Sequence, residues 1–107
     1  MTVPRDILKF NVPFHKLPTF MDDNRLTIIS ESVDACERII FEDLEEVILC
    51  EINVEFPFGT TKLKPKIVKE DISDPLEMML DWTVDMEEYE LSHRIKIMLD
   101  FLKENEL

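Results

Sequence analysis

The alternation of hydrophobic and polar residues between Val47 and Val68 constrains the fold of this chain more than any other feature. In the stretch VILCEINVEF every second residue is hydrophobic, as expected of a β-strand with one buried face. The alternation resumes in TKLKPKIV, after the break PFGT, which contains the only glycine in the chain. The sequence therefore predicts a β-hairpin over 47–68, whose first strand buries Ile48, Cys50, Ile52, Val54 and Phe56.

The charges along this hairpin suggest a register for its two strands. Acidic residues lie on the polar face of the first strand, and lysines lie on the polar face of the second. Opposite charges at facing positions stabilise a strand pair by roughly 0.2–1 kcal/mol each. A four-residue loop at 57–60 predicts the facing pairs Glu55 with Lys62, Asn53 with Lys64, and Glu51 with Lys66.

The residues before the hairpin predict strands and a helix. Residues 5–12 predict a short edge strand, because Pro4 and Pro13 flank it and proline lacks an amide donor. Residues 26–29 (LTII) predict a second strand. Hydrophobic residues at three- and four-residue spacing predict a helix over 33–45, and a strand at 38–42 remains an alternative. Between the first two strands we expect an irregular segment that packs through Phe14, Leu17, Phe20 and Met21.

The residues after the hairpin predict two helices. Ser73-Asp74-Pro75 is typical of a helix start, with a capping side chain followed by proline in the first turn. A further helix is expected to reach residue 105, although residues 89–97 also alternate as a strand would. The 107 residues thus predict a single α+β domain, with a small antiparallel sheet centred on the 47–68 hairpin and covered by two or three helices.

Composition excludes several classes of function. The chain carries 24 acidic and 12 basic residues, a net charge of −12, which argues against direct binding to nucleic acid or to an anionic membrane. One glycine is too few for a phosphate-binding loop or a nucleophile elbow. Two histidines and two widely spaced cysteines do not form a metal-binding motif. We therefore predict no catalytic residues, no cofactor and no metal.

Compartment is inferred from the cysteines and from the N-terminal residues. Cys36 and Cys50 lie on hydrophobic faces, where a free cysteine behaves as a small apolar residue. The first ten residues lack the apolar core of a signal peptide, and no apolar run approaches the length of a membrane span. We expect a cytoplasmic protein with reduced thiols.

The strongest candidate site is a run of carboxylates. Residues 70–90 contain nine acidic residues and no basic one. Members of this run recur at three- or four-residue spacing and would line one face of a continuous helix. Such a face is either a solvated surface, a docking surface for a basic protein, or a cluster that binds divalent metal. The only tryptophan lies within it, as an interface anchor or as a core residue. The candidate partner-binding residues are Asp74, Glu77, Asp81, Trp82, Asp85 and Glu88.

Two hypotheses for function follow. The first is a small, acidic, non-enzymatic protein-binding module that acts on a basic, nucleic-acid-binding partner, as an inhibitor or immunity protein from a phage or bacterium would. Its carboxylates would take the place of nucleic acid in the partner's groove. The alternative is a structural subunit that self-associates or docks into a larger complex through the apolar segment 13–21.

Overall fold

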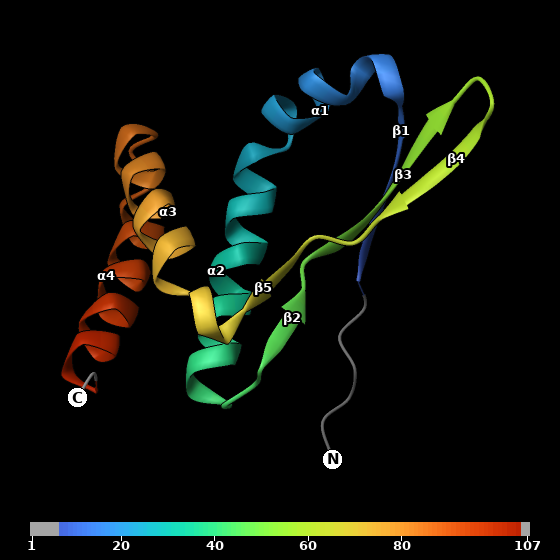
Figure 1. Cartoon of the computed structure of the whole chain (residues 1–107). Coiled ribbons are helices and arrows are strands. Elements are labelled where there is room, and N and C mark those ends of the chain that lie inside the picture. The colour runs from blue at the N-terminus through green and yellow to red at the C-terminus, as the bar shows by residue number, and fades with distance from the viewer. Residues whose placement is uncertain (1–6, 106–107) are drawn as a thin grey trace.

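The computed structural model of the protein describes residues 7–105 and has the predicted α+β architecture (Figure 1). None of the helices in this range is long and apolar enough to cross a lipid bilayer. The elements, in chain order, are β1 (Leu8–Pro13), the 3-10 helix η1 (Phe14–Lys16), α1 (Leu17–Asp23), α2 (Arg25–Phe41), β2 (Glu46–Ile48), β3 (Cys50–Phe56), β4 (Gly59–Leu63), β5 (Lys66–Val68), the 3-10 helix η2 (Lys69–Asp71), α3 (Ser73–Asp85) and α4 (Tyr89–Glu104).

The predicted hairpin is present, but it is divided between two small sheets. Strands β3 and β4 pair antiparallel, and β1 adds to β3 in the parallel direction, giving the strand order β1-β3-β4. Strands β2 and β5 form a second, two-stranded antiparallel sheet. The predicted edge strand is thus confirmed as β1, although residues 5 and 6 of its predicted range lie outside the described residues.

The predicted register of the hairpin is wrong by two residues. Phe56 faces Gly59 and Asn53 faces Lys62, so the loop contains only residues 57 and 58. Gly59 makes this tight reversal possible, because its φ of 151° is one that other residues rarely adopt. A shift of two preserves the alternation, so the acidic and lysine side chains still share one face. Glu51 consequently lies 3.6 Å from the Nζ atom of Lys62 and 3.9 Å from that of Lys64.

Leu49 explains why the hairpin changes its buried face between the two sheets. Ile52 faces Leu63 in the first sheet, and Val47 faces Ile67 in the second. Between these two pairs the first strand advances by five residues and the second strand by only four. The first strand therefore carries one extra residue at Leu49, whose amide donates to the Pro65 carbonyl. Ile48, predicted to be buried, is 39% exposed as a result.

Several sequence-based assignments before the hairpin are wrong. The predicted strand at 26–29 is the first part of α2, which begins at Arg25 and ends at Phe41 rather than at residue 45. The alternative strand at 38–42 is also helical up to Phe41. The segment expected to be irregular forms η1 and α1. After the hairpin, both predicted helices are confirmed as α3 and α4, and the alternative strand at 89–97 is wrong.

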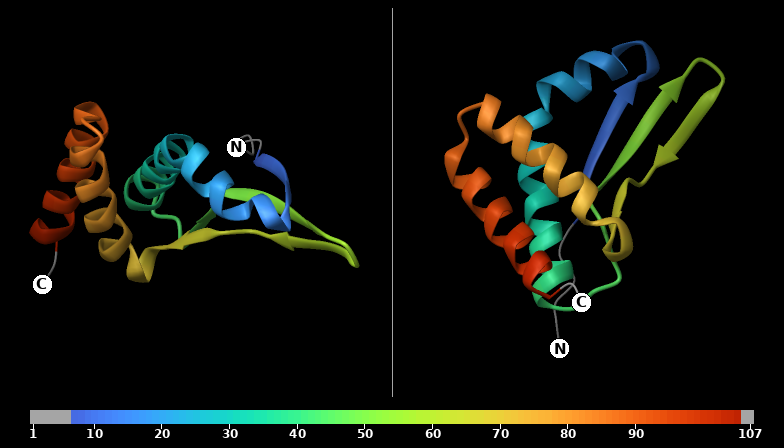
Figure 2. Two further views of the ribbon diagram at one scale, coloured as in Figure 1. Left: turned by 90° about the horizontal axis from the view of Figure 1, so that it is seen from above. Right: turned by 60° about the vertical axis from the view of Figure 1, so that its left-hand side comes forward.

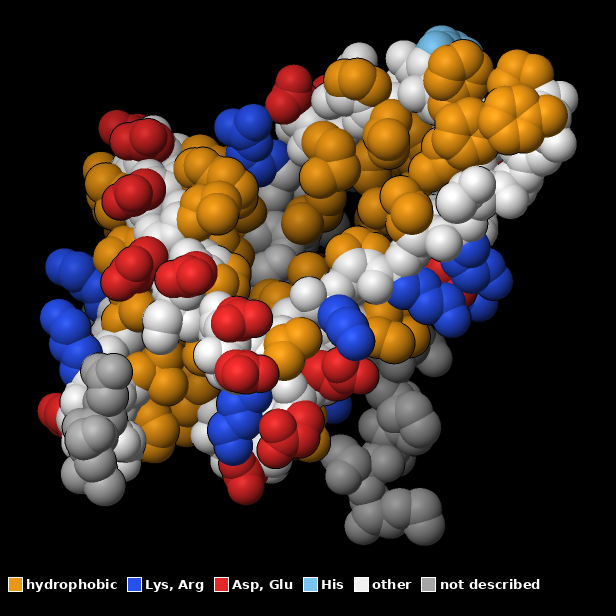
Figure 3. Space-filling model, in the orientation of Figure 1, with side chains coloured by type: hydrophobic (Ala, Val, Ile, Leu, Met, Phe, Trp, Pro, Cys, Tyr) orange, Lys and Arg blue, Asp and Glu red, His pale blue; other side chains and the backbone are white. Residues whose placement is uncertain are grey.

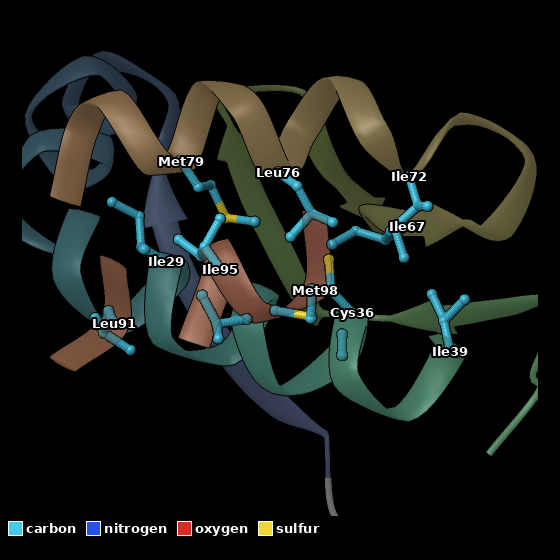
Figure 4. Close-up of a cluster of buried hydrophobic side chains, with 12 residues drawn as sticks. Ile29, Cys36, Ile39, Ile67, Ile72, Leu76, Met79, Leu91, Ile95 and Met98 are labelled. Carbon is cyan, nitrogen blue, oxygen red and sulfur yellow. The ribbon is translucent and has the colours of Figure 1, made fainter. Parts of the chain in front are cut away.

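The structure has two separate hydrophobic cores. The larger lies among α2, α3, α4 and β5, and its buried side chains point toward one another in Figure 4. The smaller lies on β1 and β3, where Val12, Cys50, Ile52 and Val54 are buried beneath Leu17 and Phe20 of α1. Figure 2 shows α2 between the α3–α4 pair and the sheet of β1, β3 and β4. Helices α1 and α2 therefore lie close to the three-stranded sheet, whereas α3 and α4 pack with α2 against β5 of the second sheet.

This division gives the protein an open shape. Its radius of gyration is 15.3 Å and its extents are 50 × 37 × 23 Å. A compact domain of this length has a radius of gyration of about 13 Å. The difference arises because β3 and β4, with β1 and η1 beside them, extend away from α2, α3 and α4 as a projecting arm (Figures 1 and 2). A large fraction of the hydrophobic side chains is consequently left at the surface.

The connection between α3 and α4 is a helix cap built without glycine. The amide of Glu88 donates to the Thr83 carbonyl at 2.8 Å, and the amide of Glu87 donates to the Val84 carbonyl at 3.1 Å. This is the hydrogen-bond pattern of a Schellman motif, whose left-handed position is usually occupied by glycine. Here Glu87 occupies it, with a φ of 59°. The backbone of Glu87 is therefore strained.

We predict that Glu87→Gly stabilises the protein by about 0.5–1 kcal/mol, because glycine adopts a positive φ without steric penalty. Urea unfolding followed by circular dichroism measures this change. The matched control is Asp81→Gly in the middle of α3, which should destabilise by about 1 kcal/mol. A Glu87→Gly variant as unstable as this control would contradict the assignment of the cap.

Candidate protein-interaction surface

The outer face of α3 presents a row of exposed carboxylates. Asp74, Asp81 and Asp85 lie within about 40° of one another around the helix axis at 3.6 residues per turn, and Glu77 lies beside them. All four side chains are exposed. From the first to the last, the row extends about 16 Å along the helix. Four of the six predicted site residues therefore share one surface.

The position of this row is fixed by the buried face of α3. Leu76, Met79 and Thr83 point into the larger core, on the side of the helix opposite the carboxylates. Thr83 is fully buried, and its hydroxyl accepts a hydrogen bond from Ser92 of α4 at 2.8 Å while donating to the Leu80 carbonyl. Because a buried hydroxyl without a partner is costly, this pair fixes the rotation of α3 against α4.

A charge cluster fixes α4 in turn against α2. The guanidinium of Arg94 donates from Nε to Glu37 at 3.0 Å and from Nη2 to Asp34 at 2.6 Å, and it makes a second bond to Glu37. These hydrogen bonds raise the pKa of Arg94 above its already high usual value, so the guanidinium stays charged. A planar guanidinium held by two carboxylates has a defined orientation. The carboxylates on α3 thus lie on a rigid support.

The carboxylates of the α3 row form no ion pair with a side chain of residues 7–105. Ion pairs elsewhere involve acidic residues of α1, α2, the segment after α2, β2 and β3. Within residues 7–105, no ion pair involves Asp74, Glu77, Asp81 or Asp85. Like charges at this spacing destabilise a helix by a few tenths of a kcal/mol per pair. A positively charged group placed beside the row would therefore reduce the repulsion among its carboxylates.

Hydrophobic side chains lie along one flank of the row. Trp82 is 41% exposed and Met78 is 50% exposed, so neither is a core residue. By helix geometry both lie on the same side of the carboxylates, within about 100° of Asp81. Figure 3 shows the resulting surface, on which acidic and hydrophobic side chains lie next to each other over α3. A large aromatic side chain beside charged groups is a common anchor in protein interfaces.

Glu88 does not extend the row as predicted. The helix ends at Asp85, and Glu88 lies beyond the strained cap, where its backbone carbonyl accepts bonds from the amide and hydroxyl of Ser92. The row was expected to continue because nothing in the sequence marks the break. Glycine is the usual signal for such a cap, and this cap contains none.

A second exposed feature, not predicted from the sequence, lies at the end of the arm. Phe56 stacks on Phe14 and on Phe58, with ring centroids 5.5 Å and 5.2 Å apart. Phe58 is 87% exposed and Phe14 is 46% exposed. Hydrophobic side chains gather at this end of the molecule in Figure 3. The one sequence signal for this feature was Phe58, which lies between proline and glycine in a predicted turn. Turns usually carry polar residues, so a phenylalanine there indicates an exposed apolar side chain. We call Phe14, Phe56 and Phe58 the aromatic tip.

No group of three potential metal ligands occurs among residues 7–105. Hollows lined by these residues along α2, beside α1 and between η2 and α4 are open to solvent, and one between β1 and α2 has space for about one water molecule. Burial raises the pKa of Cys36 to about 12 and also raises the pKa of Cys50. Both thiols are free, buried and protonated at neutral pH.

We predict that neither cysteine reacts with an aromatic disulfide reagent at pH 8 while the protein is folded. The thiolate is the reactive species, and a pKa of about 12 leaves very little of it at Cys36. Absorbance of the released thiol measures the reaction. The same protein in urea should release two equivalents. Prompt release of even one equivalent from the folded protein would contradict the buried positions.

Comparisons of the chain with protein-family models, with curated proteins and with solved structures find no match. The interpretation of the α3 surface therefore depends on its geometry and charge alone.

Proposed function

We propose that the protein is a non-enzymatic protein-binding module whose α3 surface docks on a positively charged protein partner. One observation carries the proposal: a row of four exposed carboxylates that form no ion pair within residues 7–105 lies beside an exposed tryptophan. The carboxylates would steer the partner and align it. Trp82 and Met78 would supply an apolar contact, because both side chains would be removed from water when the partner binds.

Physical chemistry favours a protein partner over a small ion for this surface. A partner bearing lysines or arginines relieves the repulsion within the row and accelerates association by long-range attraction. A lone cation would leave the neighbouring Trp82 and Met78 in water. A protein partner satisfies both parts of the surface, because its basic residues face the row and its apolar residues face the tryptophan.

The partner class that best fits is a protein with a nucleic-acid-binding groove. Such grooves line up basic residues that contact successive phosphates of the nucleic acid. The carboxylate row of α3, about 16 Å long, would cover several of these phosphate-binding positions. In this proposal the protein acts as an inhibitor or immunity protein that occupies the groove. We place it in the cytoplasm, because two free cysteines in the cores fit a reducing compartment.

A second candidate function is a structural or assembly subunit. The open shape and the exposed aromatic tip favour it, since such features are usually covered by another protein surface. In this alternative the docking segment includes Phe14 of the predicted apolar segment 13–21, joined by Phe56 and Phe58 of the arm. Leu17 and Phe20 contribute less, because both are packed against the smaller core.

We predict that Asp81→Lys/Asp85→Lys slows association with the basic partner by at least about tenfold and flattens the dependence of this rate on salt. The partner is first captured from host lysate and eluted with a salt gradient, and rates are then measured by surface plasmon resonance. The matched control is Asp100→Lys/Glu104→Lys on α4, which makes the same charge change at the same spacing on two exposed positions.

The control should keep most of the association rate and of its salt dependence. Trp82→Ala should leave association almost unchanged and accelerate dissociation by about tenfold or more. Circular dichroism establishes that each variant is folded. Equal association rates for the α3 variant, the control and the unmodified protein would exclude the α3 surface as the docking site.

A further inference from the structure

The arm of the protein carries a charge opposite to that of the rest of the chain. We define the arm as β1, η1, β3 and β4 with residue 64, that is, residues 8–16 and 50–64. It contains four lysines (Lys9, Lys16, Lys62 and Lys64) and two glutamates, Glu51 and Glu55, a net charge of +2. The whole chain has a net charge of −12. A basic, protruding surface on such an acidic protein requires a specific explanation.

The arm also carries Phe58, the most exposed of the large hydrophobic side chains in residues 7–105. Its aromatic tip consists of three stacked rings, of which Phe58 is 87% exposed. Lys16 lies two residues after Phe14 and is exposed. Lys62 and Lys64 lie farther along the same hairpin, where both form ion pairs with the half-buried Glu51. The arm thus combines lysines with an apolar anchor, which is the chemistry that the α3 surface requires in a partner.

The arm cannot meet the α3 surface of its own chain. Helix α2 lies between the arm and the α3–α4 pair (Figure 2). The carboxylate row faces away from the core that α3 shares with α2 and α4. Any contact between these two surfaces must therefore form between two molecules.

We propose that the protein self-associates head to tail, with the arm of one copy docked on the α3 surface of the next. This inference rests on the proposed function, because it names a partner for the same α3 surface. The four carboxylates of α3 would face the lysines of the neighbouring arm, and the aromatic tip would contact Trp82 and Met78. Each copy offers one arm and one α3 surface, so the contact joins two different surfaces and leaves one of each free in a dimer.

Contacts between identical surfaces are less favourable on electrostatic grounds. Two α3 surfaces facing each other would bring together eight carboxylates without a cation from either helix. Two arms facing each other would bring together two surfaces of net charge +2. Only the pairing of the arm with α3 places opposite charges together and covers Trp82 and the aromatic tip at once.

The test uses two variants, each of which alters one surface. The α3 variant is Asp81→Lys/Asp85→Lys, and the arm variant is Lys16→Glu/Phe58→Ser, both at exposed positions. Sedimentation velocity at low salt measures mass. The unmodified protein should form species larger than a dimer as its concentration rises, and salt should reverse this. Each variant alone should remain monomeric at concentrations at least tenfold above those at which the unmodified protein associates.

Mixing the variants gives the decisive result. An equimolar mixture should form a dimer and nothing larger, because each variant retains one intact surface. The proposal is overturned if the unmodified protein stays monomeric at low salt, if either variant alone associates as the unmodified protein does, or if the mixture stays monomeric.

The proposed function is tested separately with the arm variant, which retains its α3 surface. Binding of this variant to the captured basic partner, together with no self-association of the unmodified protein, would leave the proposed function standing and remove the self-association. Loss of partner binding only in the α3 variant would likewise support the proposed function by itself.

Discussion

The structure depends on α2, because this one helix contributes to the packing on both sides of the molecule. Ile29, Val33, Cys36 and Ile39 form one wall of the larger core. The side of α2 around Thr27 and Ile28 approaches Leu8, Phe10 and Cys50 of the strands. A chain of 107 residues has too little apolar material to cover both faces of such a helix and both faces of a sheet. Helix α1 and one side of α2 therefore cover only part of the arm, and Phe14 and Phe58 of the aromatic tip remain exposed.

The parts of the fold that were predicted correctly are those with strong local signals. Strict alternation identified the hairpin, and Ser73-Asp74-Pro75 identified the start of α3, although the expected capping side chain is absent: the helix begins at Ser73 itself, after Ile72. The strand predicted at 26–29 failed because Thr27, Ile28 and Ile29 favour strands locally, whereas their contacts place them on a helix. The predicted register failed because it assumed a four-residue loop at 57–60, whereas the conformation of Gly59 allows a reversal with only residues 57 and 58 in the loop.

The candidate site was predicted in part for similar reasons. The carboxylates at three- and four-residue spacing were visible in the sequence, and the structure places Asp74, Glu77, Asp81 and Asp85 on one face with Trp82 beside it. The helix break before Glu88 was missed because Glu87 holds the left-handed cap without glycine. The aromatic tip was missed because Phe14 and Phe56 lie far apart in sequence, and only the parallel pairing of β1 with β3 brings them together.

Fluorescence quenching of Trp82 tests most directly whether the α3 surface is an interface. Trp82 is the only tryptophan, so its emission reports on this surface alone. In dilute protein at high salt, neutral acrylamide should quench it efficiently, because the side chain is 41% exposed. At high protein concentration and low salt, quenching should fall as the arm of another copy covers it. Equal quenching under both conditions, with the arm variant indistinguishable from the unmodified protein, would contradict a docking surface for the arm at α3.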